Sequence, residues 1–219
     1  MIPSLVVAGG ADGRSRPTVA LNLAVALSSL GHPVELIDRD RTAPLASALL
    51  GDIGRAARQS VVLDAGAGLG LQIRSVTEST PSARLVDAGP ALDAASLAVV
   101  RLAEVVIVPL DATEESRSAL DVIAGALDGE SHRLRIVLSR VLPRDADRWR
   151  LVDDLEERFP GALSSVTVPM GRSTGPRNAA RDTTAATLYA PTGRAARAYR
   201  SIARELAPRL GLAPVEKRV

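Results

Sequence analysis

Four strand-end acids and a short loop rich in glycine and arginine are the residues of this chain that could do chemistry. Asp38 and Asp40 follow one apolar run, and Asp64 and Asp87 follow two others. The segment 9–16 follows the first apolar run and contains glycines and arginines, as a loop that approaches an anion would. In a parallel α/β sheet the carboxyl ends of the strands share one edge with helix N-termini, so these residues are expected to face one ligand site.

The spacing of apolar residues predicts the elements that position them. Short buried strands are expected over 5–8, 34–37, 60–63, 84–86, 105–110, 134–139 and 163–168. Helices are expected over 18–30, 43–50, from after Gly70 to about 78, 92–101, 114–127, 145–159, 173–182 and 192–210. The alternation indicates an α/β fold, with a mostly parallel sheet covered by helices on both faces. No linker rich in Pro, Gly or Ser divides the chain, so residues 1–219 are expected to form a single domain.

Composition removes several classes of site. The chain has no cysteine, which excludes disulfides, thiolate metal sites and cysteine nucleophiles. His32 and His132 stand apart and are interpreted as a turn residue and a surface loop residue. No run of about 18 apolar residues predicts a membrane span, and the first residues do not have the pattern of a secretion signal. The expected location is therefore the cytoplasm.

Charge is unevenly distributed. Residues 1–170 hold 17 arginines against 22 acidic residues, a net charge of −5. Residues 171–219 hold nine arginines and Lys217 against three acidic residues, a net charge of +7. Two interpretations stay open for this basic helical part from about 171: a surface for DNA or another polyanion, and a solvated helix face. The candidate DNA contacts are Arg177, Arg181, Arg194, Arg197, Arg200 and Arg204.

Four segments together carry a resemblance to a known family. They are TVALNLAVALSSLGHPVELIDRD at 18–40, LVDAGP at 85–90, AEVVIVPLDATEESRSALDVI at 103–123 and LYAPTGRAARAYRSIAREL at 188–206. As a set they resemble the ParA/MinD family of deviant Walker P-loop ATPases, and most of all its small partition proteins. The resemblance covers most of the chain and implies a single-domain, P-loop NTPase-like fold with three α/β/α layers.

The resemblance also implies a site for ATP or ADP and magnesium. It gives Asp38 the role of the acid that orients the attacking water, and associates Asp87 and Asp40 with magnesium. The positions it places at the nucleotide are Gly9, Gly10, Gly13, Arg14, Ser15, Arg16, Thr18, Ser139 and Pro191. The other interpretation of the acids is that they cap loops by accepting backbone N–H bonds.

The phosphate loop departs from the family pattern K-G-G-x-G-K-T-T. Counting back from Thr18, Ala11 and Arg16 replace the two lysines, Asp12 replaces a glycine, and Pro17 replaces the magnesium-binding threonine. A planar guanidinium is larger than an ammonium group, and proline has neither a hydroxyl nor an N–H. We therefore expect a degenerate Walker A loop with weak or absent ATP hydrolysis. The alternative is a working ATPase in which arginine replaces lysine.

By this resemblance the chain is expected to be a partition or positioning protein, for DNA segregation or cargo localisation. Family dimers coat DNA non-specifically and a partner protein releases them. Non-specific DNA, a ParB-like or cargo adaptor protein and a second copy of the chain are thus the expected partners, with the nucleoid as the expected place of action.

A third interpretation depends on VVLDAGAGLGLQI at 61–73. This segment resembles the first motif of Rossmann-like methyltransferases that bind S-adenosylmethionine, with Asp87 as the acid for the ribose hydroxyls.

Overall fold

A computed structural model describes residues 1–9, 15–40, 61–65, 71–75, 80–111, 113–139, 146–168 and 192–213. The helices expected over 43–50 and 173–182 lie outside these ranges. So do six of the candidate site residues, namely Gly10, Gly13, Arg14, Arg177, Arg181 and Pro191.

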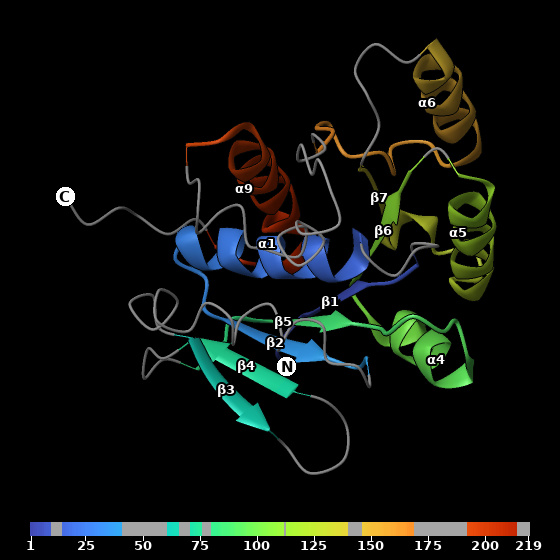
Figure 1. The fold of residues 1–219 in the computed structure, drawn as a ribbon. Helices are drawn as coiled ribbons and strands as arrows, with labels where there is room; N and C mark the ends of the chain where they lie inside the picture. The colour runs from blue at the N-terminus through green and yellow to red at the C-terminus, as the bar shows by residue number, and fades with distance from the viewer. Residues whose placement is uncertain are drawn as a thin grey trace, which may run out of the picture.

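The described strands form one seven-stranded sheet (Figure 1). They are β1 (Ser4–Val7), β2 (Val34–Asp38), β3 (Val61–Ala65), β4 (Leu71–Ser75), β5 (Ala83–Asp87), β6 (Val105–Leu110) and β7 (Leu134–Leu138). Their order across the sheet is β3-β4-β2-β5-β1-β6-β7. The five strands from β2 to β7 in this order are parallel, and β4 pairs antiparallel with both β2 and β3.

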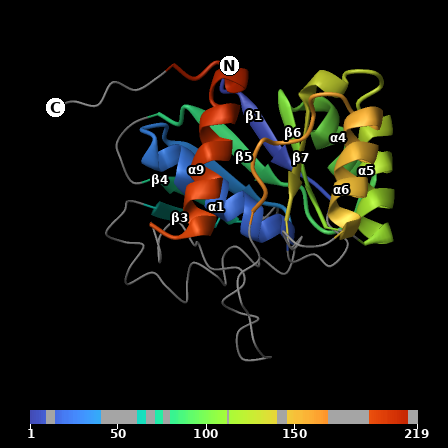
Figure 2. The same ribbon diagram turned by 90° about the horizontal axis from the view of Figure 1, so that it is seen from above.

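Helices cover both faces of the sheet. They are α1 (Ser15–Ser29), α4 (Ala94–Leu102), α5 (Glu114–Ala126), α6 (Ala146–Arg158) and α9 (Arg194–Leu206), with 3-10 turns at Ser131–Arg133 and Pro208–Leu210. One apolar core joins α1 and α9 to the sheet, and a second core joins α4, α5 and α6 to its other face (Figure 2). The predicted three-layer α/β/α fold with a mostly parallel sheet is confirmed.

Helix α1 is the central element of the first core. It packs between the sheet and α9, so that Leu23 and Leu27 have no exposed surface, and Tyr199 and Ile202 of α9 are buried in the same cluster. Proline is tolerated at the third position of α1, Pro17, because the first N–H groups of a helix have no partner within it. Because α1 is buried along most of its length, its packing fixes the position of its first turn at the edge of the sheet.

Two expected elements are wrong. Residues 71–75 form strand β4 and not a helix, because Leu71 and Ile73 alternate with polar residues in the two-residue period of a strand. Residues 163–168 form no strand; Leu163 and Val168 make only isolated bridges to Ile136 and Ser139. A short apolar run does not by itself supply a continuous row of backbone partners.

The antiparallel β3–β4 pairing also contradicts the methyltransferase interpretation. That motif needs a helix after its glycine turn, so that the helix N-terminus can face the cofactor. Here the strand that follows β3 returns beside it, with Leu63 opposite Ile73 at the edge of the sheet.

Gly9, the second residue after β1, occupies a position that requires glycine. Gly9 has a φ of +83°, and a Cβ there would lie 3.1 Å from Cδ1 of Ile123 and 3.4 Å from Cγ1 of Val108. We expect Gly9→Ala to lower the free energy of unfolding by about 1–3 kcal/mol, because it adds both backbone strain and a close contact. Urea denaturation measures this change.

Gly125 of α5 is the matched control. A Cβ there meets no atom within 4 Å, and its φ is not positive. Gly125→Ala should leave stability unchanged or raise it by about 0.5–1 kcal/mol, as alanine does within a helix. Equal effects of the two substitutions would contradict the account of Gly9.

Candidate functional site

The carboxyl ends of β2 and β5 bring three of the four predicted acids together, whereas Asp64 lies on β3, which β4 separates from β2. Strands β2 and β5 pair in a register that sets Asp38 opposite Asp87, and β1 sets Val7 opposite Asp87 on the other side. The main chain continues from β1 to Gly9 at the same edge, and α1 begins at Ser15. Sequence-distant residues thus share one edge, as predicted.

Arg16 extends from the first turn of α1 to two carboxylates at this edge. Its Nη2 donates to Oδ2 of Asp40 at 3.1 Å, and its Nε donates to Oδ1 of Asp87. The side chains of Arg16 and Asp87 have no exposed surface, and that of Asp40 is 10% exposed. The guanidinium therefore bridges two acids with almost no water around it.

Backbone N–H groups complete the network around the acids. Asp38 accepts the N–H of Asp40 at 2.9 Å through Oδ1, and Asp87 accepts the N–H of Gly89 at 3.1 Å through Oδ1. The carbonyl of Asp87 accepts the N–H of Arg39 at 3.1 Å. The N–H bonds that the two carboxylates accept are the loop-capping role considered for the acids. The main-chain bond from Arg39 to Asp87 joins the segment after β2 to the end of β5.

Four buried polar atoms at the site have no hydrogen-bond partner in the described part of the chain. They are Nη1 of Arg16, Oδ2 of Asp87, Oγ of Ser15 and Oγ of Ser139. Ser139 follows β7, and its backbone N–H donates to the carbonyl of Leu110. Buried polar groups are usually paired, so these atoms mark the site as polar and incompletely satisfied.

Burial raises the pKa of Asp87, while the Arg16 guanidinium and the Gly89 N–H lower it and partly offset the effect. Burial penalises the charged form of a carboxyl, and a neighbouring cation favours it. The ionised state of Asp87 therefore depends on Arg16.

Magnesium does not fit the acids in this arrangement. Asp40 and Asp87 direct oxygens at Arg16, so a metal ion between them would displace a guanidinium already bonded to both. Pro17 offers no hydroxyl, and Thr18, the next residue, is partly buried and its carbonyl accepts the side-chain amide of Asn22. Within the described ranges no three His, Cys, Asp or Glu side chains are grouped so that they could hold a metal ion.

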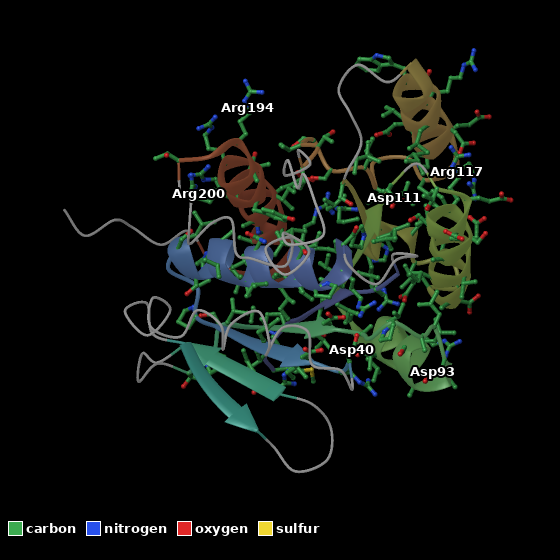
Figure 3. The ribbon with its side chains drawn as sticks, in the orientation of Figure 1. Asp40, Asp93, Asp111, Arg117, Arg194 and Arg200 are labelled. Atoms are coloured by element: carbon green, nitrogen blue, oxygen red, sulfur yellow. The ribbon has the colours of Figure 1, made fainter. Side chains whose placement is uncertain are left out.

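Sequence reasoning did not single out Asp111, which follows β6 at the same edge (Figure 3). Its Oδ1 accepts the Thr113 hydroxyl and the Ser116 hydroxyl, each at 2.6 Å, and the Thr113 N–H at 3.1 Å. An acid directly after an apolar run was the available signal. These hydroxyl bonds indicate that Asp111 organises the start of α5.

The arginines of α9 lie away from this edge and form what we term the α9 arginine face, namely Arg194, Arg197, Arg200 and Arg204. Arg194, Arg197 and Arg204 are exposed and Arg200 is partly buried. The opposite face of the helix buries Tyr199, Ile202 and Leu206 in the core with α1. Figure 3 shows Arg194 pointing away from the body of the molecule.

None of the helices that the structure describes combines the length and the apolar character that a membrane span requires.

We expect Asp87→Asn to lower the free energy of unfolding by about 3–5 kcal/mol, because it leaves the Arg16 guanidinium buried with one charged partner fewer. Asp121→Asn is the control, since Asp121 pairs with Arg158 on the surface and both side chains are substantially exposed. A surface pair contributes about 0–1 kcal/mol. Chemical denaturation of both variants measures the difference, and a loss at Asp87 no larger than at Asp121 would contradict the buried network.

Solved structures of other proteins share this fold. The MinC:MinD cell division protein complex of Aquifex aeolicus contains a chain that superposes with a TM-score of 0.69 at 19% identity, over 99% of both chains. A plasmid partition protein of Borrelia burgdorferi B31 bound to AMPPNP gives 0.66 at 15% identity, over 95% of this chain and 99% of that one. Cobyrinic acid a,c-diamide synthase of Mycobacterium smegmatis with an ATP analog and magnesium gives 0.63 at 17% identity, over 100% of both.

No protein-family model matches the chain, and no curated protein sequence matches it. At identities of 15–19% the likeness is one of fold. It confirms that this chain has the P-loop NTPase-like fold of MinD and ParA-type partition proteins, which the resemblance in sequence predicts.

Proposed function

We propose that the chain is a ParA/MinD-like positioning protein that acts through non-specific DNA and a partner protein, with weak or absent ATP hydrolysis. The observation that carries the proposal is the α9 arginine face on a fold shared with a plasmid partition protein. The proposed unit is the single domain 1–219, and the proposed place of action is the cytoplasm at the nucleoid.

The α9 arginine face is suited to a phosphate backbone. Three of its four arginines are exposed, and the one acidic residue of α9, Glu205, accepts hydrogen bonds from the hydroxyls of Ser164 and Ser165. Arginines that contact phosphates supply affinity without reading bases, and that affinity falls steeply with salt. Arg177 and Arg181, which lie outside the described residues, are the further candidate DNA contacts of this proposal.

Weak nucleotide use is supported by the state of Arg16. The side chain at the position of the family's phosphate-binding lysine is turned toward Asp40 and Asp87, and those acids are the ones proposed for magnesium. A guanidinium neutralised by two carboxylates contributes little to holding a triphosphate. The proposed catalytic acid, Asp38, accepts a backbone N–H bond from the same loop.

A working ATPase is the second candidate. It is favoured by proteins of this fold that were crystallised with nucleotide, such as MinD of Pyrococcus horikoshii OT3 with Mg-ADP. In this alternative, binding of ATP turns Arg16 from the acids to the phosphates, and Gly9, Ser15 and Ser139 line the nucleotide site.

The proposed partners are a ParB-like or cargo adaptor protein and a second copy of the chain. The MinC:MinD complex shows that a MinD of this fold assembles with another protein. We propose the equivalent kind of adaptor here, without fixing its cargo.

DNA binding tests the first part of the proposal. The double variant Arg197→Gln/Arg204→Gln should bind a short duplex of arbitrary sequence more weakly, and the slope of log K against log salt should flatten by about 2. Fluorescence anisotropy across a salt series measures both. Arg117→Gln is the control, because Arg117 is an exposed arginine on α5, in the opposite layer (Figure 3). Absence of binding at low salt, or an equal loss in the control, would remove the DNA role.

Calorimetry with ATP and ADP, each with and without magnesium, tests the second part. We expect no saturable heat from any of the four titrations, because Arg16, at the position of the family's phosphate-binding lysine, is paired with Asp40 and Asp87. Saturable, magnesium-dependent ATP binding that Arg16→Ala abolishes would favour the working ATPase instead.

A further inference from the structure

The mismatch between the acids and magnesium has a structural cause in one side chain. The geometry points to Arg16 as a tethered cation: its guanidinium fills the position between Asp40 and Asp87, and its removal exposes a divalent-cation site formed by these two carboxylates. The inference is relevant to the proposed weak binding of nucleotide, but it depends only on the contacts of Arg16 with Asp40 and Asp87.

The first argument is charge. Asp87 has no exposed surface and Asp40 is 7% exposed, so the two carboxylates that contact Arg16 lie almost entirely out of water. Buried charges are tolerated only when they are paired and hydrogen-bonded. Arg16 forms an ion pair with each of these two carboxylates. Without Arg16 both carboxylates lose one ion pair, which favours binding of another cation or of protons at this position.

The second argument is geometry. Arg16 uses Nε for Asp87 and Nη2 for Asp40, so one planar group bridges two carboxylates from different loops. An ammonium at this position would act as a point charge and lacks the fork that holds two acids at fixed separation. The bridge joins the segment after β2 to the end of β5.

The third argument is the set of oxygens that Arg16 occupies or leaves unused. Removing the guanidinium takes one partner from Oδ1 of Asp87 and one from Oδ2 of Asp40, and Oδ2 of Asp87 has no hydrogen-bond partner among the described residues. Carboxylate oxygens are the preferred ligands of Mg²⁺, Mn²⁺ and Ca²⁺, and such ions complete their coordination with water.

The test compares thermal unfolding of the full chain and of Arg16→Ala in MgCl₂, MnCl₂ or CaCl₂ with that in NaCl of matched ionic strength, without nucleotide. The wild-type Tm should respond alike to all of these salts. Arg16→Ala should unfold roughly 10 °C lower in NaCl, as expected for breaking a buried pair in a domain of this size. Divalent ions should recover at least half of that loss. Electron paramagnetic resonance should detect one bound Mn²⁺ in Arg16→Ala and none at this site in the wild type.

Two controls locate the effect. Arg16→Ala/Asp87→Asn should lose the response to divalent ions, because one carboxylate of the proposed site is neutral. Arg158→Ala removes an arginine that also contacts two acids, Asp121 and Asp154, but on the surface. Its Tm should change little and should show no divalent response.

The inference is overturned if Arg16→Ala is as stable as the wild type, if divalent ions stabilise it no more than NaCl does, or if the wild type binds Mn²⁺ between the acids with Arg16 present. If Arg16→Ala does not fold in NaCl, its refolding in MnCl₂ measures whether a divalent ion stabilises the variant. Folding only with the divalent ion supports the inference, and failure in both salts counts against it. Neither ATP nor DNA enters these measurements, so this inference and the proposed function can fail independently.

Discussion

Neutralising carboxylates at the edge of the parallel sheet is the constraint on which the rest of the site depends. The paired register of β2 and β5 sets Asp38 opposite Asp87, and neither residue has exposed surface. Charges held in this way need a partner within reach. Arg16 supplies it from the first turn of α1, and the loops after β2 and β5 adopt positions that its two ion pairs and the adjoining N–H bonds hold in place.

Most of the fold could be predicted because its signals are local. Continuous apolar runs gave β1, β2, β5, β6 and β7 to within one or two residues, and helical spacing did the same for α4, α5 and α6. The errors arose where pairing partners decide the structure. Residues 71–75 became a strand because β2 and β3 offer backbone groups on both sides, whereas 163–168 had only isolated bridges available. The alternation of Leu71 and Ile73 with polar residues was visible in the sequence, but which strands would offer backbone partners was not.

The site could be predicted as a set of residues but not as an arrangement. Strand ends in a parallel sheet meet, so Asp38, Asp40, Asp87 and Arg16 were expected near one another, and the structure brings them together. The direction in which Arg16 points could not be read from the sequence. A guanidinium at this position can face either an external anion or the neighbouring acids. Arg16 has no exposed surface, and this burial shows that its guanidinium faces the acids.

The two groups of arginines in this chain therefore differ in what they can offer a ligand. Arg16 is neutralised inside the protein, while Arg194, Arg197 and Arg204 of the α9 arginine face remain exposed. A ligand shifts a conformational equilibrium only by the difference in its affinity for the two states. On the proposed function, a nucleotide that binds neither state well cannot switch DNA binding on and off. The position of the protein in the cell is then controlled by the partner protein or by how much DNA is free to bind. On this proposal the α9 arginine face binds DNA whether or not a ligand occupies the strand-end site.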